Sequence, residues 1–202
     1  QAIMGLLNRN FADVSGRIVL DGTDLLQLDD DQVREMRGSV MAMIFQDPLS
    51  SLHPFYRIGD QLSEAVRVHN KVSKAEARKR AIDALHRVGI PSPDKRVDDY
   101  PHQLSGGMRQ RVGLARALAA DTDIILMDEA FSALDPLIRA EMQDQLLELQ
   151  KTLHKTIVFI THDLDEAVRI GNRIAILKDG RLIQVGTPRE ILHNPADEYV
   201  DR

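Results

Sequence analysis

Residues 123–129 read DIILMDE, four apolar residues that end in two carboxylates, Asp128 and Glu129. Four successive apolar residues predict a short strand that is buried on both faces, as in a parallel sheet. Open α/β sheets bind ligands beyond the carboxyl ends of their strands, so this strand would deliver both acidic side chains to one crevice. In a nucleotide site Asp128 would hold Mg²⁺, and Glu129 would orient or deprotonate the attacking water. Acidic residues are common at strand ends, so the segment by itself does not establish a nucleotide site.

The flanking sequence alternates between helix and strand patterns. Strands are predicted at MAMIF (41–45) and TIVFI (156–160), and helices at 104–120, 136–153 and 164–170, with a mostly helical stretch from about 57 to 97. Asp-Gly turns at 21–22 and 179–180 predict a hairpin near each end. Strands that alternate with helices indicate crossover units and a parallel sheet, so the predicted fold class is α/β.

A glycine-rich segment, LSGGMRQR (104–111), precedes one of these helices. Ser105 is placed to cap the helix, and Gly106 and Gly107 leave room for a phosphate to approach backbone N–H groups at the positive helix end. A capped helix after a glycine turn explains the segment equally well. Gln46 and His162 each follow an apolar strand, so each can place a polar side chain in the same crevice.

Five motifs, in this order, resemble the ATP-binding subunits of ABC transporters. They are FQDPLSSLHP with Gln46, LSGGMRQRV, ILMDE, SALD (132–135) and ITHD (160–163). The resemblance covers essentially the whole chain. It implies a RecA-like P-loop NTPase core at about 1–46 and 113–202, a small antiparallel β part near the start, and an inserted helical subdomain at about 47–112.

The same resemblance implies roles for single residues, with ATP and Mg²⁺ as cofactors. Glu129 is the catalytic base, Asp128 and Gln46 bind the metal, and His162 senses the γ-phosphate. Gln46 also acts in catalysis by coupling the γ-phosphate site to the membrane partner. Nucleotide held by the opposite subunit is contacted by Ser105, Gly106, Gly107, Gln110 and Asp135, the last of which belongs to the loop that links the two subunits.

The two halves of the chain resemble different importers. IMGLL, VMAMIFQDPLSSLHPFYRIGDQL and YPHQLSGGMRQRV are similar to ATPases of oligopeptide and dipeptide importers. ILMDEAFSALDPLIRAEMQDQL, TIVFITHDLDEAVRIGNRIAIL and VGTPREIL are similar to glycine betaine and proline importer ATPases. Both groups share the stretch around 105–112, where a crossover between two parents is one explanation.

The phosphate-binding loop of the family, Gly-x-x-x-x-Gly-Lys-Ser/Thr, does not occur in the sequence, and no lysine follows a glycine. The resemblance places that loop and its strand upstream of Gln1, and QAIMGLL (1–7) is an apolar, helical segment without a start signal. We therefore expect an N-terminally truncated domain that binds ATP poorly by itself. The alternative is an inactive or regulatory ABC-like module.

The amino-acid composition argues against some kinds of partner and bound metal. Lys and Arg total 26 against 31 Asp and Glu, a net charge of −5, so no basic excess supports nucleic acid as a partner. The absence of cysteine excludes disulfides and thiolate metal sites. A soluble ABC ATPase of DNA repair or translation would show a coiled-coil insert or a second motif set, and neither is present. The resemblance instead implies a homo- or heterodimer of ATPase subunits on membrane permeases, served indirectly by a substrate-binding protein, at the cytoplasmic face of the cell membrane.

Overall fold

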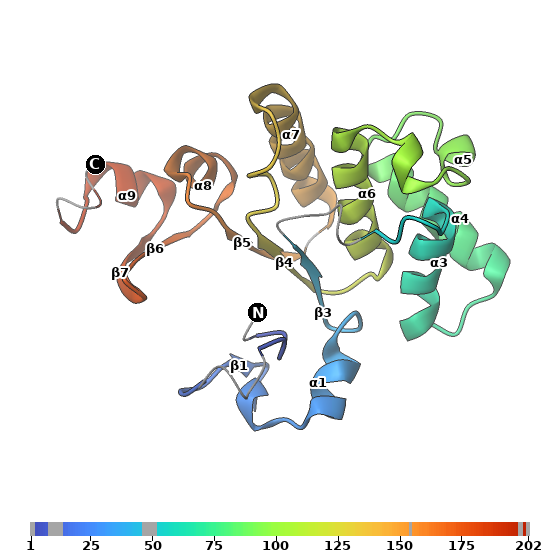
Figure 1. The fold of residues 1–202 in the computed structure, drawn as a ribbon. Helices are drawn as coiled ribbons and strands as arrows, with labels where there is room; N and C mark the ends of the chain where they lie inside the picture. The colour runs from blue at the N-terminus through green and yellow to red at the C-terminus, as the bar shows by residue number, and fades with distance from the viewer. Residues whose placement is uncertain (1–2, 8–13, 46–51, 154, 198–199, 201–202) are drawn as a thin grey trace.

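A parallel sheet lies at the centre of the molecule (Figure 1). The computed structural model describes residues 3–7, 14–45, 52–153, 155–197 and 200. The sheet has the order β3 (Met41–Ile44), β4 (Ile124–Asp128) and β5 (Thr156–Ile160). In register, Met127 of β4 lies between Ile44 of β3 and Phe159 of β5. All three strands therefore end at the same edge of the sheet, as the sequence predicts.

Burial follows from the position of each strand. The central strand β4 is buried on both faces, with Ile125, Leu126 and Met127 all under 8% exposed, which explains its unbroken apolar run. The outer strand β5 pairs only with β4 among the described residues, and Val158 and Ile160 are 41% and 52% exposed.

Among the described residues, four helices lie between β3 and β4. They are α3 (Ile58–His69), α4 (Lys74–Arg87), α5 (Pro93–Arg96) and α6 (Gly106–Ala119), with a short 3₁₀ turn at Pro101–Gln103. Buried side chains of α3, α4 and α6 belong to the same apolar cluster as Ile125 and Met127 of β4. The helix α6 runs without a break across residue 112, so the predicted subdomain boundaries at about 47 and 112 stay predictions.

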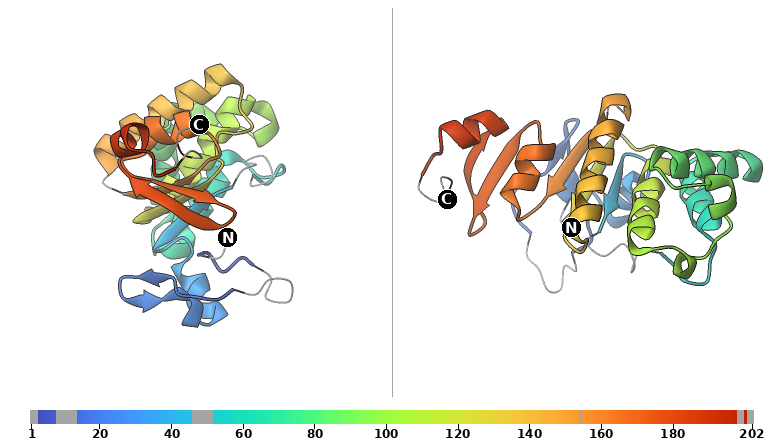
Figure 2. Two further views of the ribbon diagram at one scale, coloured as in Figure 1. Left: turned by 90° about the vertical axis from the view of Figure 1, so that its left-hand side faces the viewer. Right: turned by 90° about the horizontal axis from the view of Figure 1, so that it is seen from above.

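The C-terminal part continues the alternation. The helix α7 (Pro136–Leu153) connects β4 to β5, and α8 (Leu164–Ile170) leads to the antiparallel pair β6 (Ile174–Lys178) and β7 (Arg181–Gly186). Seen from above in Figure 2, the parallel sheet lies between this pair and the helices α3 to α6. The chain then forms α9 (Pro188–His193), a helix the sequence analysis did not predict although Thr187 and Glu190 form a capping box at its start.

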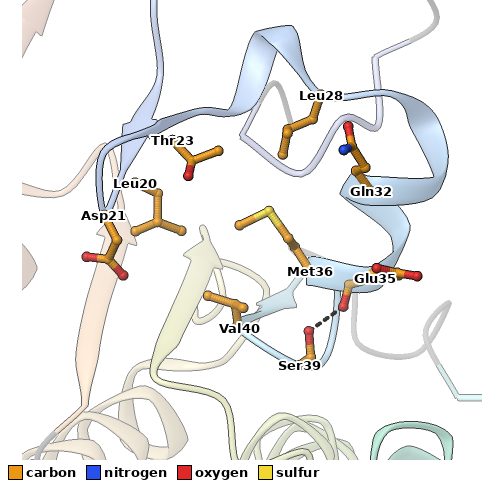
Figure 3. A pocket seen from close by; sticks show the side chains of 9 residues that line it. All are labelled: Leu20, Asp21, Thr23, Leu28, Gln32, Glu35, Met36, Ser39 and Val40. Carbon is orange, nitrogen blue, oxygen red and sulfur yellow. Dashed lines mark hydrogen bonds between the residues drawn. The ribbon is translucent and has the colours of Figure 1, made fainter.

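The predicted N-terminal hairpin is present. The strands β1 (Val19–Leu20) and β2 (Thr23–Asp24) pair around Asp21 and Gly22, whose φ angles of 48° and 83° suit a tight hairpin turn. The helix α1 (Asp30–Met36) follows, capped by Asp29. A shallow hollow of about 420 Å³ lies between this hairpin and α1 (Figure 3). None of the predicted site residues that the structure describes lines it.

The predicted helix at 1–7 is wrong for the residues that the structure describes. Residues 3–5 form a turn, and Gly5 has a φ of 59°, outside the right-handed helical region. A Cβ atom at Gly5 would lie 2.9 Å from Val33 Cγ1, so close packing against α1 also favours glycine there. No helix in the described ranges is long and apolar enough to span a bilayer.

Candidate functional site

The turn after β4 holds Glu129 in a defined backbone geometry. Glu129 has a φ of 45°, in the left-handed region that non-glycine residues seldom adopt. Its N–H donates to the Ile160 carbonyl at 2.9 Å, which extends the pairing with β5 beyond Asp128. Its carbonyl accepts from the Ser132 N–H at 3.1 Å and from the Ser132 hydroxyl at 2.9 Å. Both sides of this residue are therefore fixed to neighbouring backbone.

The carboxylate of Glu129 meets His162 at the shared edge of the sheet. His162 follows β5, and its Nδ1 lies 3.3 Å from Glu129 Oε1. The glutamate side chain is 29% exposed and the histidine side chain 72% exposed, so the pair opens to solvent. Asp128 is the last residue of β4, directly before Glu129 in the sequence, and it is partly buried. The structure thus brings Glu129 and His162 together at the strand ends, as the sequence predicts.

A second turn links these residues to α7. The Asp135 carboxylate accepts from the Ile138 N–H at 3.1 Å and so caps the first turn of α7. Arg139 donates through Nη2 to the carbonyls of Ser132 and Leu134, each at 3.2 Å. Its Nη1 lies 3.8 Å from a carboxylate oxygen of Asp163, next to His162. Sequence reasoning missed this arginine, because no local pattern marks a side chain that turns back on two carbonyls.

The start of α6 presents the glycine-rich segment. The Ser105 hydroxyl accepts from the Met108 N–H at 3.3 Å and caps the helix as predicted. A Cβ atom at Gly106 would meet nothing within 4 Å, whereas one at Gly107 would lie 2.9 Å from Ile138 Cγ2 on α7. Gly106 therefore leaves open space at the helix end, and Gly107 allows α6 and α7 to approach closely.

Two further predicted site residues are Gln110 and Gln46. Gln110 is 4% exposed, and its amide donates to the carbonyl of Ala130, the residue after Glu129. The Gln110 side chain is thus buried between α6 and the turn after β4, five residues beyond the N-cap Ser105. Gln46 lies outside the residues that the structure describes.

The donor set suits a hard cation that is shared with a ligand. Within the described ranges no group of three His, Cys, Asp or Glu residues could hold a metal ion by itself. Magnesium commonly uses one or two protein carboxylates and takes its remaining ligands from phosphate and water. The carboxylate of Asp128 at the strand end therefore fits Mg²⁺ that arrives with a phosphate ligand.

Comparison with known proteins agrees with this geometry. The family model described as "ABC transporter" matches residues 2–132. The glycine betaine/proline betaine transport system ATP-binding protein ProV of Escherichia coli (strain K12) is 51% identical over 195 residues, 96% of this chain and 47% of that protein. The dipeptide transport ATP-binding protein DppD of Lactococcus lactis is 42% identical over 200 residues, 98% of this chain and 57% of that protein.

A solved structure supports the fold assignment. The dimeric, post-hydrolysis structure of the ATP-binding cassette MJ0796 bound to ADP and Pi has a TM-score of 0.75 and 32% identity. The match covers 87% of this chain and 74% of that one. The chain thus has the expected α/β cassette fold, and it spans about half the length of the two transport proteins named above.

Proposed function

The chain belongs to the ABC transporter family, and on that premise we propose that it forms part of the ATP-binding subunit of an importer. In this proposal ATP hydrolysis in a head-to-tail dimer is coupled to solute uptake. The observation that carries it is the contact between Glu129 and His162 at the carboxyl ends of adjacent parallel strands. A carboxylate at such a position can take a proton from an attacking water, and a histidine beside it can contact the phosphate being transferred.

The residues divide the chemistry between two subunits. Asp128 would hold Mg²⁺, with Gln46 as a further ligand, and Mg²⁺ would neutralise charge on the phosphates. Glu129 would act as the base on water, and His162 would contact the γ-phosphate. Asp135, which caps α7 beside the site, would lie at the contact between the two subunits.

The opposite subunit's nucleotide would bind at the start of α6. This helix has 14 residues, and its first N–H groups point out of the helix end, where its dipole favours an anion. Open space above Gly106 leaves room for a phosphate, and the Ser105 hydroxyl lies at the same end. The dimeric cassette structure that this chain resembles supports such an arrangement of two copies.

We further propose that the phosphate-binding loop comes from a segment outside these 202 residues. The motif is absent from the sequence, and β5 offers an unpaired edge among the described residues. A groove of about 1200 Å³ lies beside β5 and is bounded on its far side by α8 and β6. A strand of the same subunit that carries the loop would extend the sheet there. Without that segment, the alternative function, an ABC-like module that does not bind ATP, is favoured.

The solute belongs to one of two classes. The identity of 51% to the glycine betaine protein favours a quaternary amine, and the 42% identity to the dipeptide protein keeps peptides as the second candidate. Membrane permeases would be the direct partners, at the cytoplasmic face of the membrane, and a substrate-binding protein would act through them.

The test is ATP hydrolysis by the complete encoded subunit, including its phosphate-binding loop, reconstituted with its permeases. We expect Glu129→Gln to retain ATP binding and dimerisation but to lower kcat by about 10²-fold or more, because the base on water is lost. Glu76→Gln is the matched control, since the Glu76 side chain is 44% exposed on α4 and pairs with Arg80, away from the groove beside β5. Turnover at the wild-type rate in Glu129→Gln would refute the proposed base.

A further inference from the structure

Several contacts hold the turn that carries Glu129, among them those of the Ser132 hydroxyl and Arg139 described above and four more. Two are its own backbone hydrogen bonds, to Ile160 and Ser132. The third is the Phe131 ring, 1% exposed and 5.5 Å from the Phe159 ring of β5. The fourth is the hydrogen bond from the Gln110 amide to the Ala130 carbonyl. The last of these comes from α6, and Arg139 of α7 also holds the turn through the Ser132 carbonyl.

Because Gln110 is buried, its amide cannot exchange this hydrogen bond for one to water. With 4% of the residue exposed, the amide is removed from water, and an unmet hydrogen bond at the Ala130 carbonyl would cost its full desolvation. Gln110 lies on the same face of α6 as Leu114 and Ala117, which are both buried, so helical packing fixes its direction. The side chain therefore acts as a brace between α6 and the turn.

We propose that Gln110 is a positioning residue that sets the orientation of the Glu129 carboxylate from α6. The inference rests on the proposed function of Glu129 and assigns Gln110 no contact with nucleotide. Ser105, the N-cap of the same helix, lies five residues earlier, which corresponds to about 7.5 Å along the axis at 1.5 Å per residue. In this proposal a phosphate bound at the start of α6 would be linked through that helix and Gln110 to the turn of Glu129 in the same chain.

Removal of the amide tests the brace. In the complete subunit, Gln110→Leu should lower kcat by about tenfold or more while the KM for ATP stays within about twofold, because misplacing a reacting group by about 1 Å can cost 10²-fold. Gln61→Leu is the matched control. Gln61 is 7% exposed and also donates to backbone carbonyls, those of His53 and Tyr56, but it lies on α3. It should lose stability without the selective loss of kcat.

A second variant gives a readout that a loss of packing would not produce. Gln110→Glu keeps the size of the side chain but can donate to the Ala130 carbonyl only while it is protonated, and burial raises the pKa of a carboxyl above its ordinary value of about 4.3. We expect kcat of Gln110→Glu relative to wild type to be highest at the acid end of the profile and to fall as the pH rises. A pH-independent ratio would contradict the inference.

Combination with Glu129→Gln separates the inference from the proposed function. If Gln110 acts through Glu129, then Gln110→Leu should change the residual single-turnover rate of Glu129→Gln by less than about twofold. An equal fold-loss in both backgrounds, or a wild-type kcat in Gln110→Leu, overturns the positioning role. If Glu129→Gln itself turns over normally, the proposed function fails first, whatever Gln110→Leu does.

Discussion

Two adjacent glycines at the start of α6 should respond in opposite ways to the same substitution. At Gly106 an added Cβ meets nothing within 4 Å, so Gly106→Ala costs no packing. The substitution should stabilise the fold, because alanine gives the unfolded chain less conformational entropy than glycine does. In a helix that gain is about 0.5–1 kcal/mol, and the first turn should give the lower end. We therefore expect the free energy of unfolding to rise by about 0.5 kcal/mol.

At Gly107 the same methyl group would lie 2.9 Å from Ile138 Cγ2, which real Cβ atoms essentially never do. Overpacking of this kind costs about 1–3 kcal/mol. After the gain of about 0.5 kcal/mol is subtracted, Gly107→Ala should lower the free energy of unfolding by about 0.5–2.5 kcal/mol.

Urea unfolding followed by circular dichroism measures both values, with the slope m checked for constancy. The double variant Gly107→Ala, Ile138→Ala removes the contacting methyl group, so its loss should be smaller than the sum of the two single losses. Equal stabilities for Gly106→Ala and Gly107→Ala would refute the close approach of α6 to α7. In the proposed function the more stable Gly106→Ala should also hydrolyse ATP more slowly, because its methyl group occupies the space for phosphate.

Two further predictions use caps and ion pairs. Ser105→Ala removes the hydroxyl that accepts from the Met108 N–H, and Ser73→Ala removes the hydroxyl that accepts from the Glu76 N–H, so each variant should lose about 1 kcal/mol of stability. Only Ser105→Ala should also slow ATP hydrolysis. Equal ATPase rates in the two variants would contradict a role for Ser105 in phosphate binding. The hydrogen bond from Arg78 lowers the pKa of the Asp98 carboxyl, so this group stabilises the fold above its unfolded pKa of about 3.9 and loses that contribution as the pH falls through its lower folded pKa. In Asp98→Asn the urea midpoint should therefore fall less steeply at acid pH than it does in the wild type. An unchanged pH dependence would show that Asp98 does not contribute to acid unfolding.

Much of the fold could be predicted because its signals are local. The bounds of α7 and β5 agree residue for residue with the predicted 136–153 and 156–160. Proline suits the first turn of α7, and the apolar run of TIVFI suits a strand. The meeting of Glu129 with His162 could also be predicted, because adjacent parallel strands end at one edge.

The remaining features depend on contacts between distant segments. The left-handed backbone of Glu129 is set by Ile160 and Ser132, and neither neighbour in the sequence signals it. The burial of Gln110 did have a signal, since it shares a helical face with Leu114 and Ala117. Its contact with the Ala130 carbonyl had none, because residues 110 and 130 come together only when α6 packs against the turn after β4. The contact of Gln110 with nucleotide stays a prediction.

The continuity of α6 constrains how the helical part of the molecule can move. Residues on both sides of the predicted boundary at 112 are buried in one apolar cluster with β4, so a hinge at that point would open packed core. Rotation of α3 and α4 with the start of α6 must then either bend this helix or displace Gln110 from the Ala130 carbonyl. Because that carbonyl lies one residue beyond Glu129, the second route would change the geometry of the proposed base whenever the helices move. Coupling between helical motion and hydrolysis would thus follow from one buried amide, without any direct contact between the two ATP sites.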